Sequence, residues 1–334
     1  MIKLSPRSSY LLGKAMRYGI TLFIILTINF TIPRMMPGDP MINLLGEDIT
    51  RVDEAMLDEM RAEYGLDRPL HEQYVKYMIG ITGFDFGYSI HKNLKVTELI
   101  GDRLFWTTVL VLPSVIIGAA LALILGTIAG FRNGGKIDGL LTSISMIMYT
   151  CPHFLVAMLA VSIFSFHMGW FPLGNMTSGR LHGIAYVLDV AWHLFLPVAV
   201  LSLFGAAYKF LVVRNSIRQI LGEYFIFVTK AKGLPDRVIE LRHVLRNVLP
   251  QFISIVALNF GFMVSGALII EIVFSLNGMG TLIYDAVLSR DYPVMQGSFV
   301  VLTVFVLLAN FIADILYGVA DPRIGDSKNR SASM

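Results

Sequence analysis

Six long stretches of the chain are nearly free of charged residues, and each is long enough to cross a bilayer as a helix. A helical span needs roughly 17–25 apolar residues. The predicted spans lie within residues 1–36 and at 104–131, 139–167, 190–213, 251–275 and 297–318. The first is short, but Arg17 and Arg34 can extend along the helix toward the headgroups. We therefore expect an all-α integral membrane protein with six transmembrane helices.

Composition supports this class. Hydrophobic residues make up 55% of the 334 residues and charged residues only 15%, with a mean hydropathy of +0.66. A soluble chain of this composition could not cover its apolar surface with polar groups. The net charge of +3 gives no indication of nucleic-acid binding. The single cysteine, Cys151, excludes an internal disulfide and a cysteine-based metal site.

Lysine and arginine are concentrated on one side of the predicted topology. They cluster at the amino end, between the second and third spans, in residues 214–250 and in the tail, residues 321–334. Basic residues near spans mark the cytoplasmic side. We expect both termini to be cytoplasmic and residues 37–103 to lie outside the membrane. The first apolar run lacks a small-residue cleavage site, so it is interpreted as a retained anchor.

The external segment is predicted to be helical in part. Arg51 to Glu63 has apolar residues at helical spacing among acids, and a second helix is expected from His71 to Ile79. Gly80 to Gly87 then breaks the regular pattern. Two interpretations remain open: a small helical cap on the outer membrane face, or a solvated loop with two amphipathic helices.

Small residues recur every fourth position along the second span. Such a stripe lets helix backbones approach closely in lipid, where apolar burial does not drive helix association. We favour packing within the chain over a subunit interface. The stripe consists of Gly118, Ala122, Gly126 and Gly130.

Motifs for catalysis or for cofactor binding are absent. Gly130 to Lys136 resembles a phosphate-binding loop, but Ile137 stands where Ser or Thr would hold magnesium, and a membrane helix precedes it instead of a strand. The histidines have no metal-ligand spacing, and no GxSxG motif occurs. We expect a chain that is not an enzyme and binds no metal.

Polar residues inside the predicted spans could form a proton relay, because charges near the bilayer centre are costly and are retained for function. Glu271 and Asp314 lie near span ends, with Asn259 and Asn310 deeper. We favour capping and interhelical hydrogen bonds over a relay.

Residues 214–250 form the longest basic connection, with seven Lys/Arg against three Asp/Glu. Arg214 to Phe227 is predicted to extend the fourth span as a helix, and Gly233-Leu234-Pro235 to stop it. Asp236 then caps a short helix, Arg237 to Val248, lying along the membrane surface before Leu249-Pro250 opens the fifth span. Attraction to anionic lipid is an alternative role, but it does not explain the sharp corner.

This loop resembles the cytoplasmic signature of ABC-importer permeases, in particular the dipeptide/oligopeptide/nickel permease family and its B-type subunit. The resemblance covers residues 10–325. The matching pieces are Glu223-Tyr224, Thr229 to Leu234, His243 to Asn247, Leu249-Pro250, Met36 to Pro40, Tyr64 to Pro69, Phe84 to Ser89, Glu271 to Ser275, Gly278 to Gly280, Asp291 to Gly297 and Asp314 to Arg323. Phe227-Val228-Thr229 replaces the family's Glu-Ala-Ala, and Leu276-Asn277 replaces its usual aromatic-Pro pair.

The resemblance implies a type I ABC importer permease fold in a prokaryotic cell membrane. Its implied partners are a second, C-type permease, two cytosolic ATPase subunits that carry ATP and Mg, an extracytoplasmic binding protein and membrane lipid. The implied cargo is a di- or oligopeptide; oligosaccharides, nickel chelates and glutathione are alternatives. An ion-coupled secondary transporter is the alternative from another class.

The resemblance also assigns the ATPase-coupling residues. Gly233 would permit the turn, Ala231 and Leu234 would pack in a cleft of the ATPase, and basic side chains would meet acidic residues there. The assigned set is Glu223, Tyr224, Lys230, Ala231, Lys232, Gly233, Leu234, Arg237, His243, Arg246 and Asn247.

Overall fold

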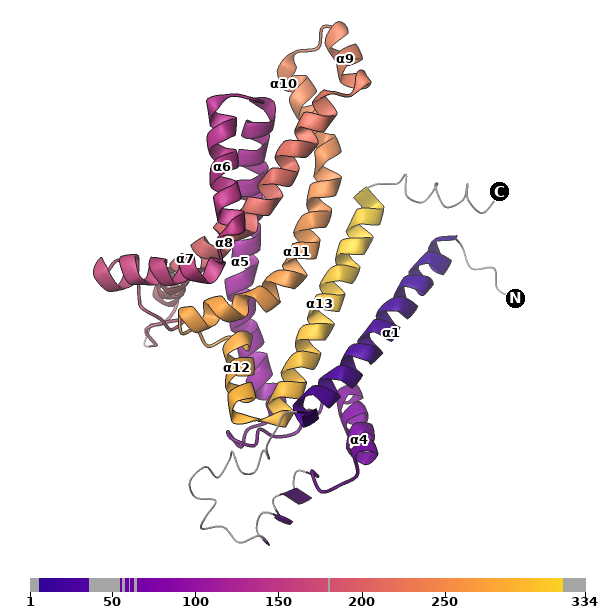
Figure 1. The fold of residues 1–334 in the computed structure, drawn as a ribbon, viewed down its shortest axis with the longest axis vertical. Coiled ribbons are helices and arrows are strands. Elements are labelled where there is room, and N and C mark those ends of the chain that lie inside the picture. Colours follow the sequence, from indigo (N-terminus) through magenta and orange to yellow (C-terminus); the bar gives the residue numbers. More distant parts are fainter. Residues whose placement is uncertain are drawn as a thin grey trace. The chain divides into compact units, whose positions relative to one another are not determined.

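The structure is a computed structural model that describes residues 6–35, 55, 58–59, 61–62, 65–179 and 181–320, with side chains outside 6–12, 260–266 and 313–320. Its described elements are helices, apart from one isolated bridge between Tyr88 and Lys95 (Figure 1). They are α1 (Pro6–Met35), α4 (Leu70–Thr82), α5 (Val96–Phe131), α6 (Lys136–Thr150), α7 (His153–Ala160), the π-helical η2 (Val161–His167), α8 (Ile184–Leu221), α9 (Tyr224–Ala231), α10 (Asp236–Val238), the π-helical η3 (Ile239–Leu245), α11 (Arg246–Val273), α12 (Met279–Ser289) and α13 (Tyr292–Ala320).

Four described helices are long and apolar enough to cross a membrane: Gly13–Met35 of α1, α5, α8 and Tyr292–Ile312 of α13. A fifth candidate is the pair formed by α6 and α7–η2. The prediction of one long helix over residues 139–167 was wrong, because this pair is broken and bends by 98°. The break lies at Cys151, whose ψ of 136° is extended. A residue before proline avoids the helical region, and Pro152 follows directly.

The helices extend past the bounds that charged residues suggested. α8 runs from Ile184 to Leu221, beyond both ends of the predicted 190–213, and α13 begins at Tyr292 instead of 297. A helix can leave the bilayer without ending, so charge marks the interface and not the helix end. The short helix α12 has no counterpart in the prediction. Most of the predicted helix Arg51 to Glu63, and the tail after residue 320, lie outside the described residues.

The chain divides into two compact units, one made of the described residues up to 106 with 278–307, the other of 107–277 with those from 308 onward. In the first unit, α4 is fastened to α1. The Arg34 Nη2 group donates to Gln73 Oε1 at 2.9 Å, and Tyr77 Oη donates to the Leu26 carbonyl at 3.2 Å. Tyr74 also stacks edge-on against Phe30. The helix predicted at residues 71–79 is therefore held against the first span.

In the second unit, the small-residue stripe of α5 lies against α8 of the same chain. A Cβ atom built on Gly118 would lie 2.8 Å from the Ser202 carbonyl oxygen, and one on Gly126 or Gly130 would lie 2.9 Å from Val213 or Ile217. Ala122, in the same stripe, is fully buried. Real Cβ atoms do not approach backbone and branched side chains so closely. The short distance between the two helices therefore depends on glycine at these positions.

We predict that Gly126→Ala destabilises the protein by about 1–3 kcal/mol, because the added methyl group overpacks the α5–α8 contact. The matched control is Gly139→Ala on α6, where an added Cβ meets nothing within 4 Å. There the loss of glycine flexibility leaves stability unchanged or raises it slightly. Apparent unfolding temperatures of the detergent-purified variants test this, and equal temperatures for the two variants would contradict the close-packing account.

Candidate functional site

The polypeptide turns sharply between α8 and α11, in a segment we call the corner, residues 222–238. The prediction that the fourth span continues helically to Phe227 was wrong. α8 ends at Leu221, and Glu223 is extended with a ψ of 143° before α9 begins at Tyr224. The break follows Gly222, whose low helix propensity suits a helix end. The corner thus carries a separate helix of eight residues.

The predicted stop at Gly233-Leu234-Pro235 is confirmed. Gly233 has a φ of +75°, and its N–H donates to the Lys230 carbonyl at 2.9 Å. An added Cβ would meet nothing within 4 Å, so the backbone conformation and not a lack of space favours glycine here. Pro235 follows with an extended ψ of 142° and prevents α9 from continuing.

The return path differs from the prediction of a separate short helix lying along the membrane. Helical structure resumes at Asp236 and runs through α10, η3 and α11 without interruption. Pro250 lies inside α11 and does not separate two helices. Val248 and Phe252, on either side of it, are buried in the core.

The inner face of the corner is part of the hydrophobic core of the second unit. Ile226 of α9 is 1% exposed, and Ile239 and Val244 of η3, just beyond the corner, are also buried. They belong to one cluster with residues of α5, α8 and α11. Its other members are Ala122, Ala129, Ala206, Phe210, Val213, Ile217, Val248 and Phe252. Displacement of α9 must therefore displace the ends of α5 and α8 that share this core.

The outer face of α9 carries exposed aromatic side chains. Tyr224 is 78% exposed and Phe227 is 68% exposed, with their rings stacked at a centroid distance of 6.3 Å. Sequence reasoning assigned Tyr224 but missed Phe227, which it noted only as a departure from the family pattern. The signal was available, because positions 224 and 227 share a helix face opposite the buried Ile226 and Thr229.

The structure gathers most of the assigned coupling residues at the corner. Lys230, Lys232 and Arg237 are exposed, and none forms an ion pair with another described residue. Also exposed there are Glu223, Ala231, Gly233 and Leu234. The remaining three, His243, Arg246 and Asn247, lie farther along the return helix. The Asn247 side chain donates to the His243 carbonyl at 2.5 Å.

The turn between α5 and α6 lacks the strand that precedes a phosphate-binding loop. α5 ends at Phe131 and α6 begins at Lys136, so the glycine-rich segment joins two helices, and no strand precedes it. The Gly134 N–H donates within the chain, to Asp138 Oδ2 at 3.0 Å.

The expected interhelical hydrogen bond is present at Glu271, whereas Asn259 bonds within its own helix and Asn310 Oδ1 is buried with no hydrogen-bond partner among the described residues. Glu271, fully buried in α11, accepts a hydrogen bond from Thr107 Oγ1 of α5 at 2.6 Å. Asn259 donates to the Ile255 carbonyl of its own helix. Lys209 is fully buried in α8, where its Nζ donates to the Gly205 carbonyl at 2.7 Å. The side chain of Asp314 lies outside those described.

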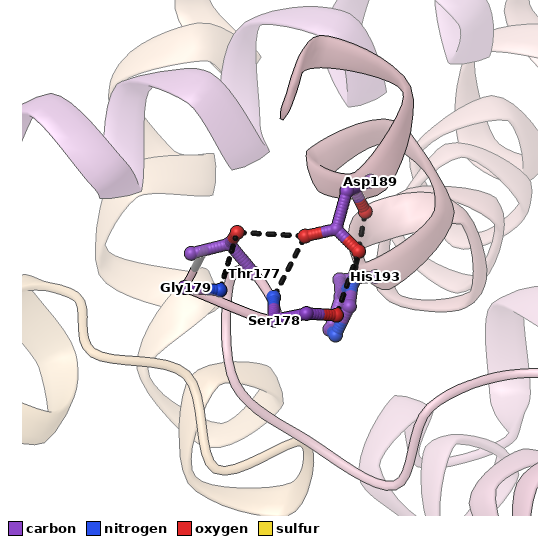
Figure 2. Close-up of polar contacts among 5 residues, drawn as sticks. All are labelled: Thr177, Ser178, Gly179, Asp189 and His193. Atoms are coloured by element: carbon purple, nitrogen blue, oxygen red, sulfur yellow. Dashed lines mark hydrogen bonds and ion pairs between the residues drawn. The ribbon is translucent and has the colours of Figure 1, made fainter. Parts of the chain in front are cut away.

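A second polar cluster holds the segment that precedes α8 against the first turns of that helix (Figure 2). The Asp189 carboxylate accepts hydrogen bonds from Thr177 Oγ1 at 2.7 Å and from Ser178 N–H and Oγ at 2.7 and 2.8 Å. His193 Nδ1 lies 3.4 Å from Asp189 Oδ1. These contacts order the connection between η2 and α8, far along α8 from the corner.

Comparison with known proteins gives consistent results over both halves of the chain. Residues 118–326 match the family described as "Binding-protein-dependent transport system inner membrane component", and residues 8–111 match the corresponding N-terminal family. The chain is 32% identical to the oligopeptide transport system permease protein AppB of Bacillus subtilis, over 95% of this chain and 99% of that protein. It is 31% identical to the di/tripeptide transport system permease protein DppB of Pseudomonas aeruginosa, over 93% and 97%.

The fold also resembles a solved transporter. A chain of the MetNI methionine ABC transporter, in an inward-facing conformation, superimposes with a TM-score of 0.55 at 16% identity, over 67% of this chain and 96% of that one. The chain described here therefore belongs to the family of binding-protein-dependent transport system inner membrane components, with the all-helical fold of a type I ABC importer permease.

Proposed function

We propose that this chain is the B-type permease subunit of an ATP-driven importer of di- and oligopeptides. The observation that carries the proposal is the corner. Its inner face is built into the helix core, and its outer face presents Tyr224, Phe227 and three basic side chains that form no ion pair with another described residue. Such a surface fits a cleft in a partner protein. The peptide cargo rests on the similarity to permeases named for oligopeptide and di/tripeptide transport.

The proposed topology has six spans with both termini in the cytoplasm. α1, α5, the bent α6–α7 pair, α8, α11 and α13 supply the spans. The corner and the α5–α6 turn lie at one end of the second unit, since Gly130 contacts Ile217, and both are basic. Basic connections favour the cytoplasmic side. The segment after α1 then lies outside the cell, where a binding protein delivers its cargo.

In the proposed cycle, this chain contributes half of the pathway and a C-type permease contributes the other half. Each corner inserts into one ATPase subunit, and ATP and Mg are bound only by those subunits. Closure of the ATPases on ATP pulls the corner, and the shared core carries this displacement to α5 and α8. ATP can shift the equilibrium between the inward and outward states only by the difference between its affinities for the closed and the open ATPases.

Reconstitution tests the proposed function. The chain is co-expressed with the permease, ATPases and binding protein encoded beside it and placed in proteoliposomes with labelled di-, tri- and oligopeptides. We expect peptide uptake that requires ATP inside the vesicles and the binding protein in the external medium. Oligosaccharides, a nickel chelate and glutathione serve as competing cargoes. Displacement of peptide by one of these would reassign the substrate, and uptake that persists without ATP but collapses with the proton gradient would indicate a secondary transporter.

The docking role of the corner is tested separately. We predict that the double substitution Tyr224→Ala and Phe227→Ala weakens binding of the permease to the ATPase subunits by about tenfold or more, because exposed aromatic anchors dominate such interfaces. The core is untouched, since both rings are exposed. The control is Ile137→Ala, which removes an exposed apolar side chain from α6. Unchanged affinity in the aromatic variant, measured by titration with purified ATPases, would refute the docking assignment.

A further inference from the structure

An acidic side chain is buried at the start of α6, next to the turn that joins it to α5. Asp138 is 3% exposed. Its carboxylate accepts the Gly134 N–H at 3.0 Å and Thr142 Oγ1 at 3.3 Å. These bonds fix the carboxylate relative to the first turn of α6. They leave it facing α8.

Arg214 of α8 completes the site. Its Nε donates to Asp138 Oδ1 and its Nη2 donates to Asp138 Oδ2 at 2.9 Å, so the pair is bidentate. The remaining Nη1 group donates to Asn215 Oδ1 at 3.1 Å. Arg214 lies two helical turns before α8 ends at the corner. The pair thus joins α8, which leads into the corner, to α6, which is not part of the corner.

The corner core reaches α6 only weakly. The buried members of that cluster come from α5, α8, α9, η3 and α11, and Leu141 is the α6 residue among the partly buried side chains packed against it. α6 also packs directly against α8, and α7 continues that contact; the pairs Tyr149 with Tyr208 and His153 with Phe204 are among the contacts. A bidentate guanidinium–carboxylate pair fixes both distance and orientation.

Stability alone is a weak explanation for such a pair. Replacing a buried ion pair with apolar groups is often neutral or stabilising, because desolvation offsets the attraction between the charges. A requirement for fixed orientation explains why two charges are kept at the junction of α6 and α8.

We propose that Asp138 and Arg214 are positioning residues that make α6 move together with α8 when the corner is displaced, so that ATP-driven motion reaches the bent α6–α7 span. The motion would then be passed on at Cys151, where α6 ends and the chain bends by 98° into α7. This inference rests on the proposed importer function.

The test uses the complete transporter in proteoliposomes and measures two quantities, the amount of assembled complex and the peptide transported per ATP hydrolysed. Asp138→Asn and Arg214→Met each leave one buried group without its charged partner, and we expect less assembled complex. The double variant removes both charges and should restore assembly. Its transport per ATP should nevertheless fall by about fivefold or more, the usual scale of coupling between sites.

Two further variants make the outcome decisive. Arg214→Lys keeps the charge but loses the bidentate geometry, and we expect normal assembly with reduced transport per ATP. Arg218→Met removes an exposed arginine one turn farther along α8 and should change neither quantity. If the double variant or Arg214→Lys transports as much peptide per ATP as the wild type, the inference is overturned. The Asp138–Arg214 pair would then have only a structural role. Absence of ATP-dependent uptake by the unaltered chain would instead overturn the proposed function.

Discussion

The close approach of α5 to α8 is the constraint on which the second unit depends. Lipid is as apolar as a leucine side chain, so helices in a membrane are not driven together by apolar burial and must gain contact by fitting closely. Gly118, Gly126 and Gly130 provide that fit, because each leaves room for backbone or branched side chains of α8. Buried residues of α9, η3 and α11 at that end of the unit share one cluster with this pair.

The corner is attached by two kinds of contact with different mechanical properties. The inner side chains of α9 and η3, such as Ile226 and Val244, share one tightly buried core with α5 and α8. Native cores are close-packed and transmit displacement instead of absorbing it. The ion pair of Asp138 with Arg214 adds a directional link to α6. The outer face of α9 remains exposed, which suits a surface that is completed by a partner subunit.

Sequence reasoning located the apolar helices and the end of α9, but it missed two helix breaks and the contacts between distant segments. Uninterrupted apolar runs located the helices, and Gly233 with Pro235 located the end of α9, because backbone preference decides both. The bend at Cys151-Pro152 was missed because apolar composition continues through it. The helix also continues through Pro250, where the sequence had suggested a boundary.

The functional site shows the same division. The basic and glycine positions of the corner were assigned from their resemblance to a family signature. Phe227 was missed because it departs from that signature, although it lies on the same exposed face as Tyr224. The partnership of Asp138 with Arg214 joins residues 76 positions apart in the chain and was beyond any local pattern.

The shared core requires the corner and the neighbouring helix ends to move as one body. This is measured by the distance between spin labels at Phe225→Cys on α9 and Asn133→Cys in the α5–α6 turn, in a Cys151→Ala background. Pulsed electron paramagnetic resonance would be recorded on the assembled transporter with and without ATP. We predict one distance distribution that ATP does not shift, although label pairs between the two permease subunits do shift. A change of several ångströms within this chain would contradict the claim.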